Sequence, residues 1–300
     1  MSNQFFNRVV GTRGGGTLGG DAPTGVFQLT AAEYRARPGV SNSMLNAMDP
    51  PARLAAYVED DPTASMVMGT LIHEAILEPG KPPTPIAVPP DKYVNDKGES
   101  KDWTFNANVC KAWRTEMESA GKIVVTRADW AKVQGCVQAI LNHRVAREYF
   151  TNGQAELSVF HDRNGTLTKA RPDFAPDAIP FLLDIKKVSR GNGEPRWFAT
   201  HAVKMGYHRQ AWSYLSAWNE ETDEFRQGVI FVTIEEELPH LVSLVQLSER
   251  TMELGREDYL RRLAMYEECK ATGFWPGYPE TPVVAEPDEW VFRSCERDLA

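Results

Sequence analysis

Two aspartates and a lysine near the middle of the chain have the types and spacing of a metal-assisted phosphodiesterase site. Arg171-Pro172-Asp173 is followed, after a short turn, by Asp184-Ile185-Lys186. Two carboxylates that are brought together raise each other's pKa, and a hard divalent cation between them removes the repulsion. We therefore expect Mg²⁺ here, with Mn²⁺ as a substitute. A lysine beside the ion could orient or help to deprotonate a water molecule, or neutralise charge on the scissile phosphate.

The neighbouring residues predict that both motifs lie on adjacent β-strands. Residues 167–171 have a strand pattern that Pro172 interrupts, and residues 176–177 are typical of a turn. Residues 181–186 predict a second strand, whose period of two places Asp184 and Lys186 on the same face. Taken alone, an Asp-x-Lys triplet is more often an ordinary surface salt bridge, because such triplets recur by chance.

Two predicted helices would bring further groups to these strands. Residues 68–77 read as a helix on which Gly69 and His73 lie one turn apart. A glycine there permits close backbone approach, and a neutral imidazole could bind a metal. One face of a second helix carries polar-tipped side chains: Tyr207, Gln210 and Tyr214. By itself the histidine would more often be a hydrogen-bonded core residue, and the stripe could equally be an aromatic core.

Further patterns predict the surrounding elements. Helical patterns occur at residues 41–59, 65–77 and 126–150, before the strands. After them, residues 228–247 predict a β-hairpin and residues 249–270 a long amphipathic helix.

The order of the motifs resembles the PD-(D/E)xK nuclease superfamily, and specifically its RecE-type exonuclease domain (exodeoxyribonuclease VIII). That order is Gly-Thr-x-x-His, Arg-Pro-Asp, Asp-x-Lys and Tyr-x-x-Gln. The resemblance extends from about residue 40 to residue 278, with further matching blocks at 41–45, 77–79, 155–160, 169–173 and 271–278. It implies an α/β fold with a PD-(D/E)xK restriction-endonuclease-like core, in which a central mixed β-sheet is flanked by helices.

The resemblance also implies roles for individual residues. The metal ligands would be His73, Asp173, Asp184 and the backbone carbonyl of Ile185, with Glu156 as a possible contact through water. The catalytic residues would be Asp173, Asp184, Lys186, Gln210 and Tyr207. DNA contacts are expected from Ser41, Ser43, Arg171, Lys187, Arg190, Lys204, Arg209 and Tyr214. Glu156 could equally be a surface charge at a strand edge. Lys187 departs from the family pattern, which has a small hydroxyl residue there, although the strand period favours Lys186 as the catalytic lysine.

The implied function is a metal-dependent deoxyribonuclease. Relatives of this type are 5′-to-3′ exonucleases on double-stranded DNA ends, and they leave 3′ overhangs for recombination by strand annealing. Expected partners are DNA ends and a RecT-like annealing protein, in a phage or prophage setting, with the enzyme as a trimeric or tetrameric ring. Alternatives are a single-strand exonuclease or endonuclease of the same superfamily, and a catalytically silent DNA-end-binding factor. An unrelated small-molecule metalloenzyme would explain neither the order of the motifs nor the charge distribution.

The charge distribution is uneven along the chain. The formal net charge is −8, from 33 Lys and Arg against 41 Asp and Glu, which argues against a nonspecific DNA binder. Residues 161–210 contain nine basic and five acidic residues, a local net of +4, so the remainder sums to −12. This pattern predicts a basic cleft in an acidic exterior, although without the motifs it would be ordinary surface charge.

Length and composition predict one large domain. Hydrophobic residues make up 42% of the chain, enough for a sizeable core. We expect a flexible Gly-rich leader at residues 1–25, a single exonuclease domain at 26–280 and a C-terminal tail at 281–300. The sequence shows no apolar run typical of a membrane span or signal peptide, so we expect a cytoplasmic protein without membrane association. The four cysteines form no Cys-x-x-Cys pair, which argues against zinc and iron–sulfur sites.

Overall fold

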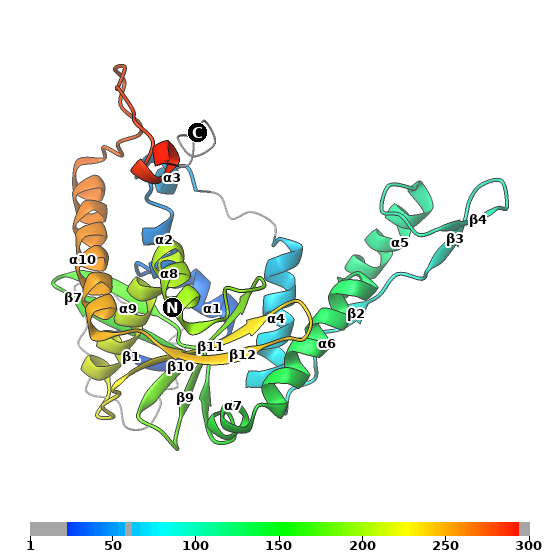
Figure 1. Ribbon diagram of the computed structural model, residues 1–300, viewed down its shortest axis with the longest axis horizontal. Coiled ribbons are helices and arrows are strands. Elements are labelled where there is room, and N and C mark those ends of the chain that lie inside the picture. The colour runs from blue at the N-terminus through cyan, green and yellow to red at the C-terminus, as the bar shows by residue number, and fades with distance from the viewer. Residues whose placement is uncertain (1–22, 58–61, 294–300) are drawn as a thin grey trace, which may run out of the picture.

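The computed structural model of the chain describes residues 23–57 and 62–293 and has a mixed α/β architecture (Figure 1). Its strands are β1 (Gly25–Gln28), β2 (Ile86–Ala87), β3 (Lys92–Val94), β4 (Ser100–Asp102), β5 (Ile123–Val124), β6 (Gly153–Ala155), β7 (Leu157–Arg163), β8 (Thr166–Ala170), β9 (Phe174–Pro176), β10 (Phe181–Val188), β11 (Gly228–Glu235) and β12 (Val242–Gln246). Its helices are α1 (Ala31–Ala36), α2 (Asn42–Asn46), α3 (Ala52–Ala55), α4 (Ala64–Leu77), α5 (Asn108–Ser119), α6 (Arg127–Asn142), α7 (Arg144–Tyr149), α8 (Pro195–Met205), α9 (Tyr207–Glu221) and α10 (Glu249–Thr272).

A five-stranded mixed sheet, ordered β12-β11-β10-β9-β6, forms the centre of the molecule. β10 and β11 are parallel, with Asp184 opposite Phe231, whereas β11 pairs antiparallel with β12 and β10 with β9. Parallel neighbours need a crossover connection, and α8 and α9 supply it between β10 and β11. The central mixed sheet flanked by helices that the sequence predicts is therefore confirmed.

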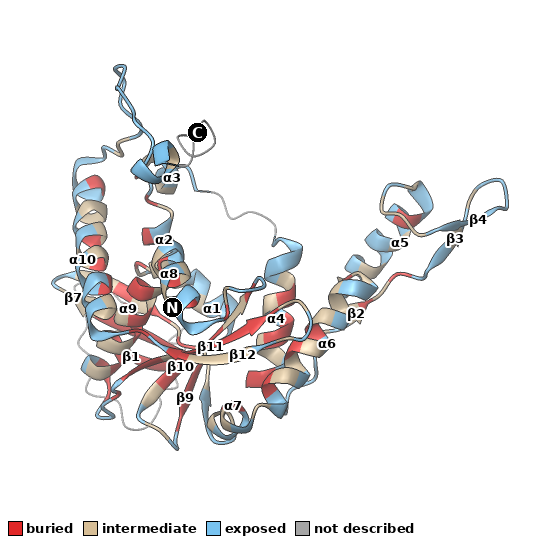
Figure 2. Cartoon of the chain, in the orientation of Figure 1, coloured by how far each residue is buried: buried red, intermediate tan, exposed pale blue. Residues whose placement is uncertain are grey.

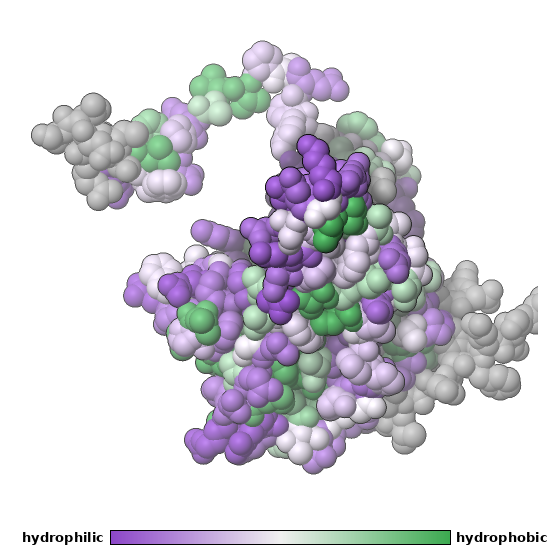
Figure 3. All heavy atoms as spheres, turned by 90° about the vertical axis from the view of Figure 1, so that its right-hand side faces the viewer, coloured by the Kyte–Doolittle hydropathy of each residue, from purple (hydrophilic) through white to green (hydrophobic). Residues whose placement is uncertain are grey.

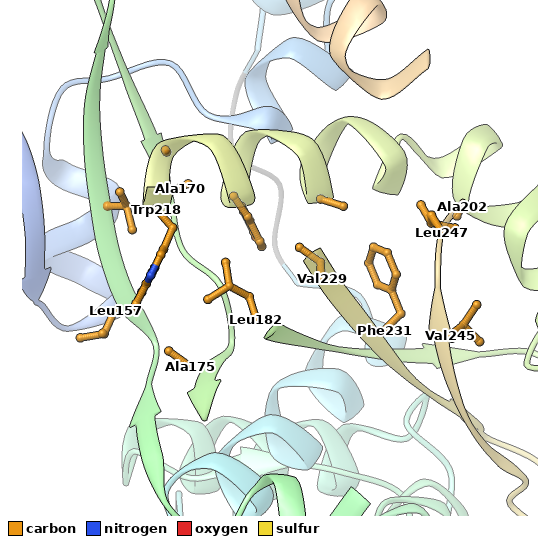
Figure 4. Close-up of a cluster of buried hydrophobic side chains, with 14 of the residues drawn as sticks. Leu157, Ala170, Ala175, Leu182, Ala202, Trp218, Val229, Phe231, Val245 and Leu247 are labelled. Carbon is orange, nitrogen blue, oxygen red and sulfur yellow. The ribbon is translucent and has the colours of Figure 1, made fainter. Parts of the chain in front are cut away.

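Helices cover both faces of this sheet, and its central strands are largely buried (Figures 1 and 2). Because side chains alternate along a strand, successive residues face the helices on opposite sides of the sheet. Leu182 and Phe231 pack with Ala202 of α8 and Trp218 of α9 (Figure 4). The neighbouring residues of β10 pack on the opposite face, against α4 and α6. Because β10 is buried on both faces, a polar side chain on it must find its partner inside the protein.

Two predicted helices are wrong as continuous elements. Of the predicted helix at 41–59, the described residues 41–57 form α2 and α3 instead, because Pro50 and Pro51 cannot continue a helix from α2, and residues 58–59 lie outside the described part of the chain. Residues 126–150 form α6 and α7, which meet at His143, whose side chain accepts a hydrogen bond from Ala146 N–H and caps α7. The helices predicted at 65–77 and 249–270 and the hairpin at 228–247 are confirmed as α4, α10 and β11-β12.

A second, three-stranded antiparallel sheet, ordered β1-β7-β8, packs against α9. α10 in turn packs along α9, and Tyr259 and Leu263 of α10 share a small core with Leu45 of α2. This arrangement fixes the first turn of α9, which lies beside the strands that carry the sequence motifs.

Gly255 lets α10 lie against the backbone of α9, because a Cβ at this position would overlap the carbonyl oxygen of His208. We expect Gly255→Ala to lower the free energy of unfolding by about 1–3 kcal/mol, the usual cost of overpacking, in urea denaturation. Gly69→Ala is the matched control, because the space around Gly69 is open, and it should gain about 0.5–1 kcal/mol. Equal stability of the two variants would contradict the close packing. The open space also means that no described backbone approaches Gly69.

A small extension built from β3, β4 and α5 projects away from the sheet (Figure 1). Trp103 holds it together, with its ring centroid 5.0 Å from that of Trp113 and further edge-on contacts to Tyr93 and Phe105. Figure 3 shows the molecule from the side of this extension, where the surface is mostly hydrophilic with small apolar patches.

The expected leader and tail fall partly outside the described residues, which omit 1–22 and 294–300. Gly25, the last residue of the expected leader, already begins β1, which pairs with β7. Beyond residue 280, Val284 and Trp290 are exposed. The domain boundaries stay predictions. None of the helices within the described ranges is long and apolar enough to cross a membrane.

Candidate active site

β10 places Asp184 and Lys186 on the same face, as its period of two predicts. The Lys186 ammonium forms an ion pair with the Asp184 carboxylate, and the two side chains are only 14% and 1% exposed. The next lysine, Lys187, instead pairs with Glu236 and Ser65. The geometry therefore associates Lys186, and not Lys187, with the carboxylates.

Asp173 reaches the same point from the segment between β8 and β9. β9 pairs with β10, with Phe174 opposite Leu183. This pairing brings Asp173, the residue before Phe174, beside the middle of β10. The Asp173 carboxylate then accepts a hydrogen bond of 2.6 Å from the Ile185 N–H. Asp173 is thus held by the backbone of the strand that carries Asp184.

His73 joins the cluster from α4, which packs on the Ile185 face of the sheet. Its Nδ1 lies 3.5 Å from Oδ2 of Asp173. Its Nε2 lies 3.1 Å from the carbonyl oxygen of Ile185 and donates to it, because a carbonyl can only accept. His73 therefore contacts two of the other expected metal ligands, the Asp173 carboxylate and the Ile185 carbonyl, and the fourth ligand, Asp184, precedes Ile185 in the chain.

Burial and charge set the protonation of this cluster. Burial raises the pKa of Asp173 to about 6; His73 opposes the rise and Asp184 adds to it. For Lys186 burial acts to lower the pKa, but the carboxylates of Asp184 and Asp173 outweigh it, so the pKa is raised. Lys186 is therefore a cation at neutral pH, suited to neutralising negative charge and not to accepting a proton.

The donor set suits a hard divalent cation. Both oxygens of Asp184 are buried, and neither makes a regular hydrogen bond with the described residues, apart from the ion pair with Lys186. Buried carboxylate oxygens normally have such partners, and carboxylate, carbonyl and imidazole groups together can bind Mg²⁺ or Mn²⁺. Within the described ranges no group of three or more His, Cys, Asp or Glu side chains is arranged to hold a metal ion by itself. The fit to a divalent cation rests instead on the Asp184 oxygens, which lack regular hydrogen bonds in the described structure, and on the carbonyl and imidazole donors near them.

The first turns of α9 supply the expected tyrosine and glutamine. The centroid of the Tyr207 ring is 4.7 Å from Lys186 Nζ, within cation–π range. Gln210 donates a hydrogen bond of 2.7 Å to the Tyr214 hydroxyl, and its own Oε1 is buried without a described partner. The structure thus brings Tyr207 to the cluster and ties Gln210 to Tyr214. Because Tyr214 is only 8% exposed, it is not available for the DNA contact expected of it.

The sequence matches, over residues 49–283, the family described as a PDDEXK-like domain of unknown function (DUF3799). The chain belongs to this family. The PD-(D/E)xK superfamily that the order of the motifs predicts is therefore confirmed. No curated protein matched the sequence.

One solved structure shares the fold of this PDDEXK-like chain. A candidate exonuclease from Eubacterium rectale superposes with a TM-score of 0.59 at 11% identity, over 89% of this chain and 98% of its own. An alkaline exonuclease from Laribacter hongkongensis matches with a TM-score of 0.28 at 16% identity, over 57% and 89%. A phage-related exonuclease from Haemophilus somnus matches with a TM-score of 0.32 at 13% identity, over 81% of this chain and 100% of its own. The first shows a shared fold, and the other two are too distant to add weight.

The residues expected to bind DNA do not form one surface in the PDDEXK-like chain. Arg209 is buried, pairs with Asp258 of α10 and donates to the Asn46 side chain over 2.5 Å, so it joins three helices and is not available for the expected DNA contact. Arg190 donates to the carbonyl of Leu238. Lys187 is paired to Glu236, so Arg209 and Lys187 have partners inside the protein, whereas Arg190 remains exposed.

The remaining expected DNA contacts are distributed differently. Ser41 caps the N-terminus of α2, accepting a hydrogen bond from Met44 N–H, while Ser43 is exposed on that helix. Lys204 is exposed near the end of α8. Arg171 lies at the cluster itself, where it is bonded to Glu156.

A cleft of about 610 Å³ between α1 and α4 opens onto His73 and Asp173. Its charged lining comprises the acidic residues Glu33, Glu74, Glu78, Glu156 and Asp173 and the basic residues Arg35, Lys81 and Arg171. Five carboxylates against three permanent cations make this lining acidic, so the expectation of a basic cleft is wrong here. The cleft lacks the expected cations because Lys187 pairs with Glu236, Arg190 donates to the Leu238 carbonyl and Arg209 pairs with Asp258. An acidic entrance attracts metal cations, and a bound cation would reduce the repulsion between this lining and a phosphate.

Glu156 holds the segment that carries Asp173. Its backbone N–H donates to the Asp173 carbonyl oxygen over 2.8 Å, and its carboxylate accepts two hydrogen bonds from Arg171. Its φ is +54°, a left-handed conformation that is uncommon for a residue other than glycine. Arg171 also donates to Ser158 Oγ over 3.4 Å. Glu156 is therefore a positioning residue for Asp173 in this structure, in place of the surface charge that was its alternative.

Two residues at the site carry no motif and escaped the sequence reasoning. Tyr34 of α1 lines the cleft, with its ring centroid 5.5 Å from the guanidinium carbon of Arg171. His201 of α8 has its ring centroid 5.9 Å from that of Tyr207. No helical spacing relates His201 to Tyr207, because Gly206 ends α8 between them, and nothing local predicts where α1 lies.

Proposed function

We propose that this PDDEXK-like protein is a metal-dependent deoxyribonuclease. The observation that carries the proposal is the convergence of Asp173, Asp184, Lys186 and His73 from three separate segments of the chain. A buried pair of carboxylates beside a buried ammonium is an arrangement found at catalytic sites more than in structural cores. The description of the Eubacterium rectale structure as a candidate exonuclease agrees with it.

His73, Asp173, Asp184 and the Ile185 carbonyl are the groups that would hold Mg²⁺, with Mn²⁺ as a substitute. When bound, such an ion supplies Lewis-acid polarisation of the phosphate and a water of lowered pKa. Lys186, a cation at neutral pH, would neutralise charge that develops on the scissile phosphate. The Ile185 N–H keeps the Asp173 carboxylate in place.

The finer proposal is a 5′-to-3′ exonuclease on double-stranded DNA ends, leaving 3′ overhangs for recombination by strand annealing. Its support is the RecE-type order of motifs. A cytoplasmic phage or prophage enzyme, a trimeric or tetrameric ring and a RecT-like partner belong to the same proposal. A single-strand exonuclease or endonuclease, and a silent DNA-end-binding factor, are its alternatives.

Digestion of linear duplex DNA labelled separately at the 5′ and 3′ ends tests the polarity. With Mg²⁺, we expect labelled mononucleotides from the 5′-labelled substrate at the earliest time points. The 3′-labelled strands should keep their label while they shorten from the 5′ end. Early release of the 3′ label would reverse the polarity, and internal cuts on a closed circle would indicate an endonuclease.

Glu156→Gln is expected to lower the rate of DNA hydrolysis by roughly tenfold, because charge-assisted hydrogen bonds to Arg171 are worth about 1.5–3 kcal/mol and hold the Asp173 segment. The Mg²⁺ concentration for half-maximal rate should stay the same as in the wild type. A metal titration of the initial rate measures both quantities. A large increase in the Mg²⁺ requirement would instead favour the water-mediated metal contact.

A further inference from the structure

α8 carries an exposed aromatic and basic stripe. Trp197, His201 and Lys204 are spaced at i, i+4 and i+7, so they lie on one face of the helix. Trp197 is 58% exposed. Arg196 is adjacent, with its guanidinium carbon 5.8 Å from the centroid of the Trp197 ring. We call these four residues the α8 stripe.

The α8 stripe is continuous with the candidate active site. His201 packs against Tyr207 with ring centroids 5.9 Å apart. Tyr207 in turn lies under the Lys186 ammonium, 4.7 Å away. Ring contacts therefore run from the reacting cluster to His201, and Trp197 lies one helical turn before His201 on the same face of α8.

The charge of the stripe is the opposite of that of the cleft. Pro195–Met205 contains Arg196 and Lys204 and no carboxylate. Within the described part of the chain, Lys204 forms no ion pair or hydrogen bond. Glu194, just before the helix, is engaged as its cap, accepting from Trp197 N–H over 3.1 Å. The stripe therefore presents two cations to an anionic ligand, unlike the acidic lining beside His73.

We propose that the α8 stripe binds the unpaired strand of the DNA substrate, with Trp197 stacked on a base and Arg196 and Lys204 at phosphates. An exposed aromatic ring can stack only on a base whose face is free, which a base inside a duplex does not offer. His201 would continue this path to Tyr207. The proposal rests on the proposed function and adds to it the route by which a strand reaches Lys186.

Fluorescence anisotropy with a short labelled oligothymidylate, in EDTA so that no hydrolysis occurs, tests the stripe. Trp197→Ala should raise the Kd about tenfold, as expected for the loss of one stacked base, while Trp197→Phe should stay within about threefold. The double variant Arg196→Gln with Lys204→Gln should reduce the slope of log Kd against log salt by about 1.4, two single-strand phosphate contacts. A blunt duplex should be affected much less by Trp197→Ala.

Phe225→Ala and Lys111→Gln are the matched controls, because both residues are exposed on other parts of the molecule. They should bind like the wild type, and an equal loss in these controls would overturn the stripe. So would an unchanged Kd for Trp197→Ala, or a duplex affinity that falls as far as the single-strand affinity. If the wild type bound neither DNA form, the proposed function would fail with the stripe, whereas the first three outcomes leave that function intact.

Discussion

Lys186→Ala is expected to reduce DNA hydrolysis by at least about 100-fold, the usual cost of removing one group that stabilises transition-state charge. Lys186 is the buried cation beside both carboxylates, and its raised pKa keeps it charged at neutral pH. The initial rate of nucleotide release from linear duplex DNA with Mg²⁺ measures the effect.

Lys187→Ala is the matched control for this substitution. The two lysines are adjacent, but Lys187 pairs with Glu236 and Ser65, away from Asp184. It should lose no more than about threefold in rate, because its partners Glu236 and Ser65 lie outside the Asp173–Asp184–Lys186 cluster. A loss in Lys187→Ala as large as in Lys186→Ala would show that the strand period does not select the catalytic lysine.

Lys186→Ala should also change the stability of the protein. It leaves the Asp184 carboxylate buried without its cation, and breaking a buried ion pair typically costs about 3–5 kcal/mol. Mg²⁺ should recover part of that loss, so the rise in Tm on adding Mg²⁺ should be larger in the variant than in the wild type.

Asp184→Asn is expected to abolish both hydrolysis and the stabilisation by metal. Asparagine keeps the shape of the side chain but removes the charge of the carboxylate. The two oxygens of that carboxylate lack regular hydrogen bonds in the described structure. A ligand that binds only the folded state raises Tm, and this gain disappears when binding is lost. We expect the wild-type Tm to rise with Mg²⁺ or Mn²⁺ and the Tm of Asp184→Asn to stay unchanged, with a rate reduced by about 1,000-fold or more.

Asp177→Asn provides the control. Asp177 is exposed in the turn between β9 and β10, and its substitution removes the same charge from the same region. Its Tm should still rise with metal, and its rate should match that of the wild type. An Asp184→Asn protein that is stabilised by Mg²⁺ as much as the wild type would place the metal elsewhere.

The core of the candidate site could be predicted because its determinants are local. Asp184 and Lys186 share a face through the period of a single strand, and their motif context identified Asp173 and His73. The mixed sheet followed from the same strand patterns together with the resemblance. The elements that were predicted well, such as α4 and α10, have clear ends: Thr63 and Ser248 cap their N-termini, and Gly273 ends α10.

The parts that sequence reasoning missed depend on contacts between distant segments. The local sequence predicts an exposed cation at Arg209. In the fold Arg209 is buried and pairs with Asp258, which lies 49 residues later in the chain. Glu156 reads as a strand-edge charge, but its partner Arg171 arrives from the next strand. Local charge counting therefore predicted a basic cleft, whereas the fold places Lys187, Arg190 and Arg209 outside the cleft lining and brings the carboxylates of α1 and α4 to the entrance.

The most direct test of the central claim is the release of nucleotides from linear duplex DNA by the wild-type protein with Mg²⁺, with Mn²⁺ and with EDTA. We expect hydrolysis with either metal, none with EDTA, and full recovery when Mg²⁺ is restored in excess. Hydrolysis that persists in EDTA, or a folded protein that releases no nucleotide with either metal, would contradict a metal-dependent nuclease centred on Asp173, Asp184 and Lys186.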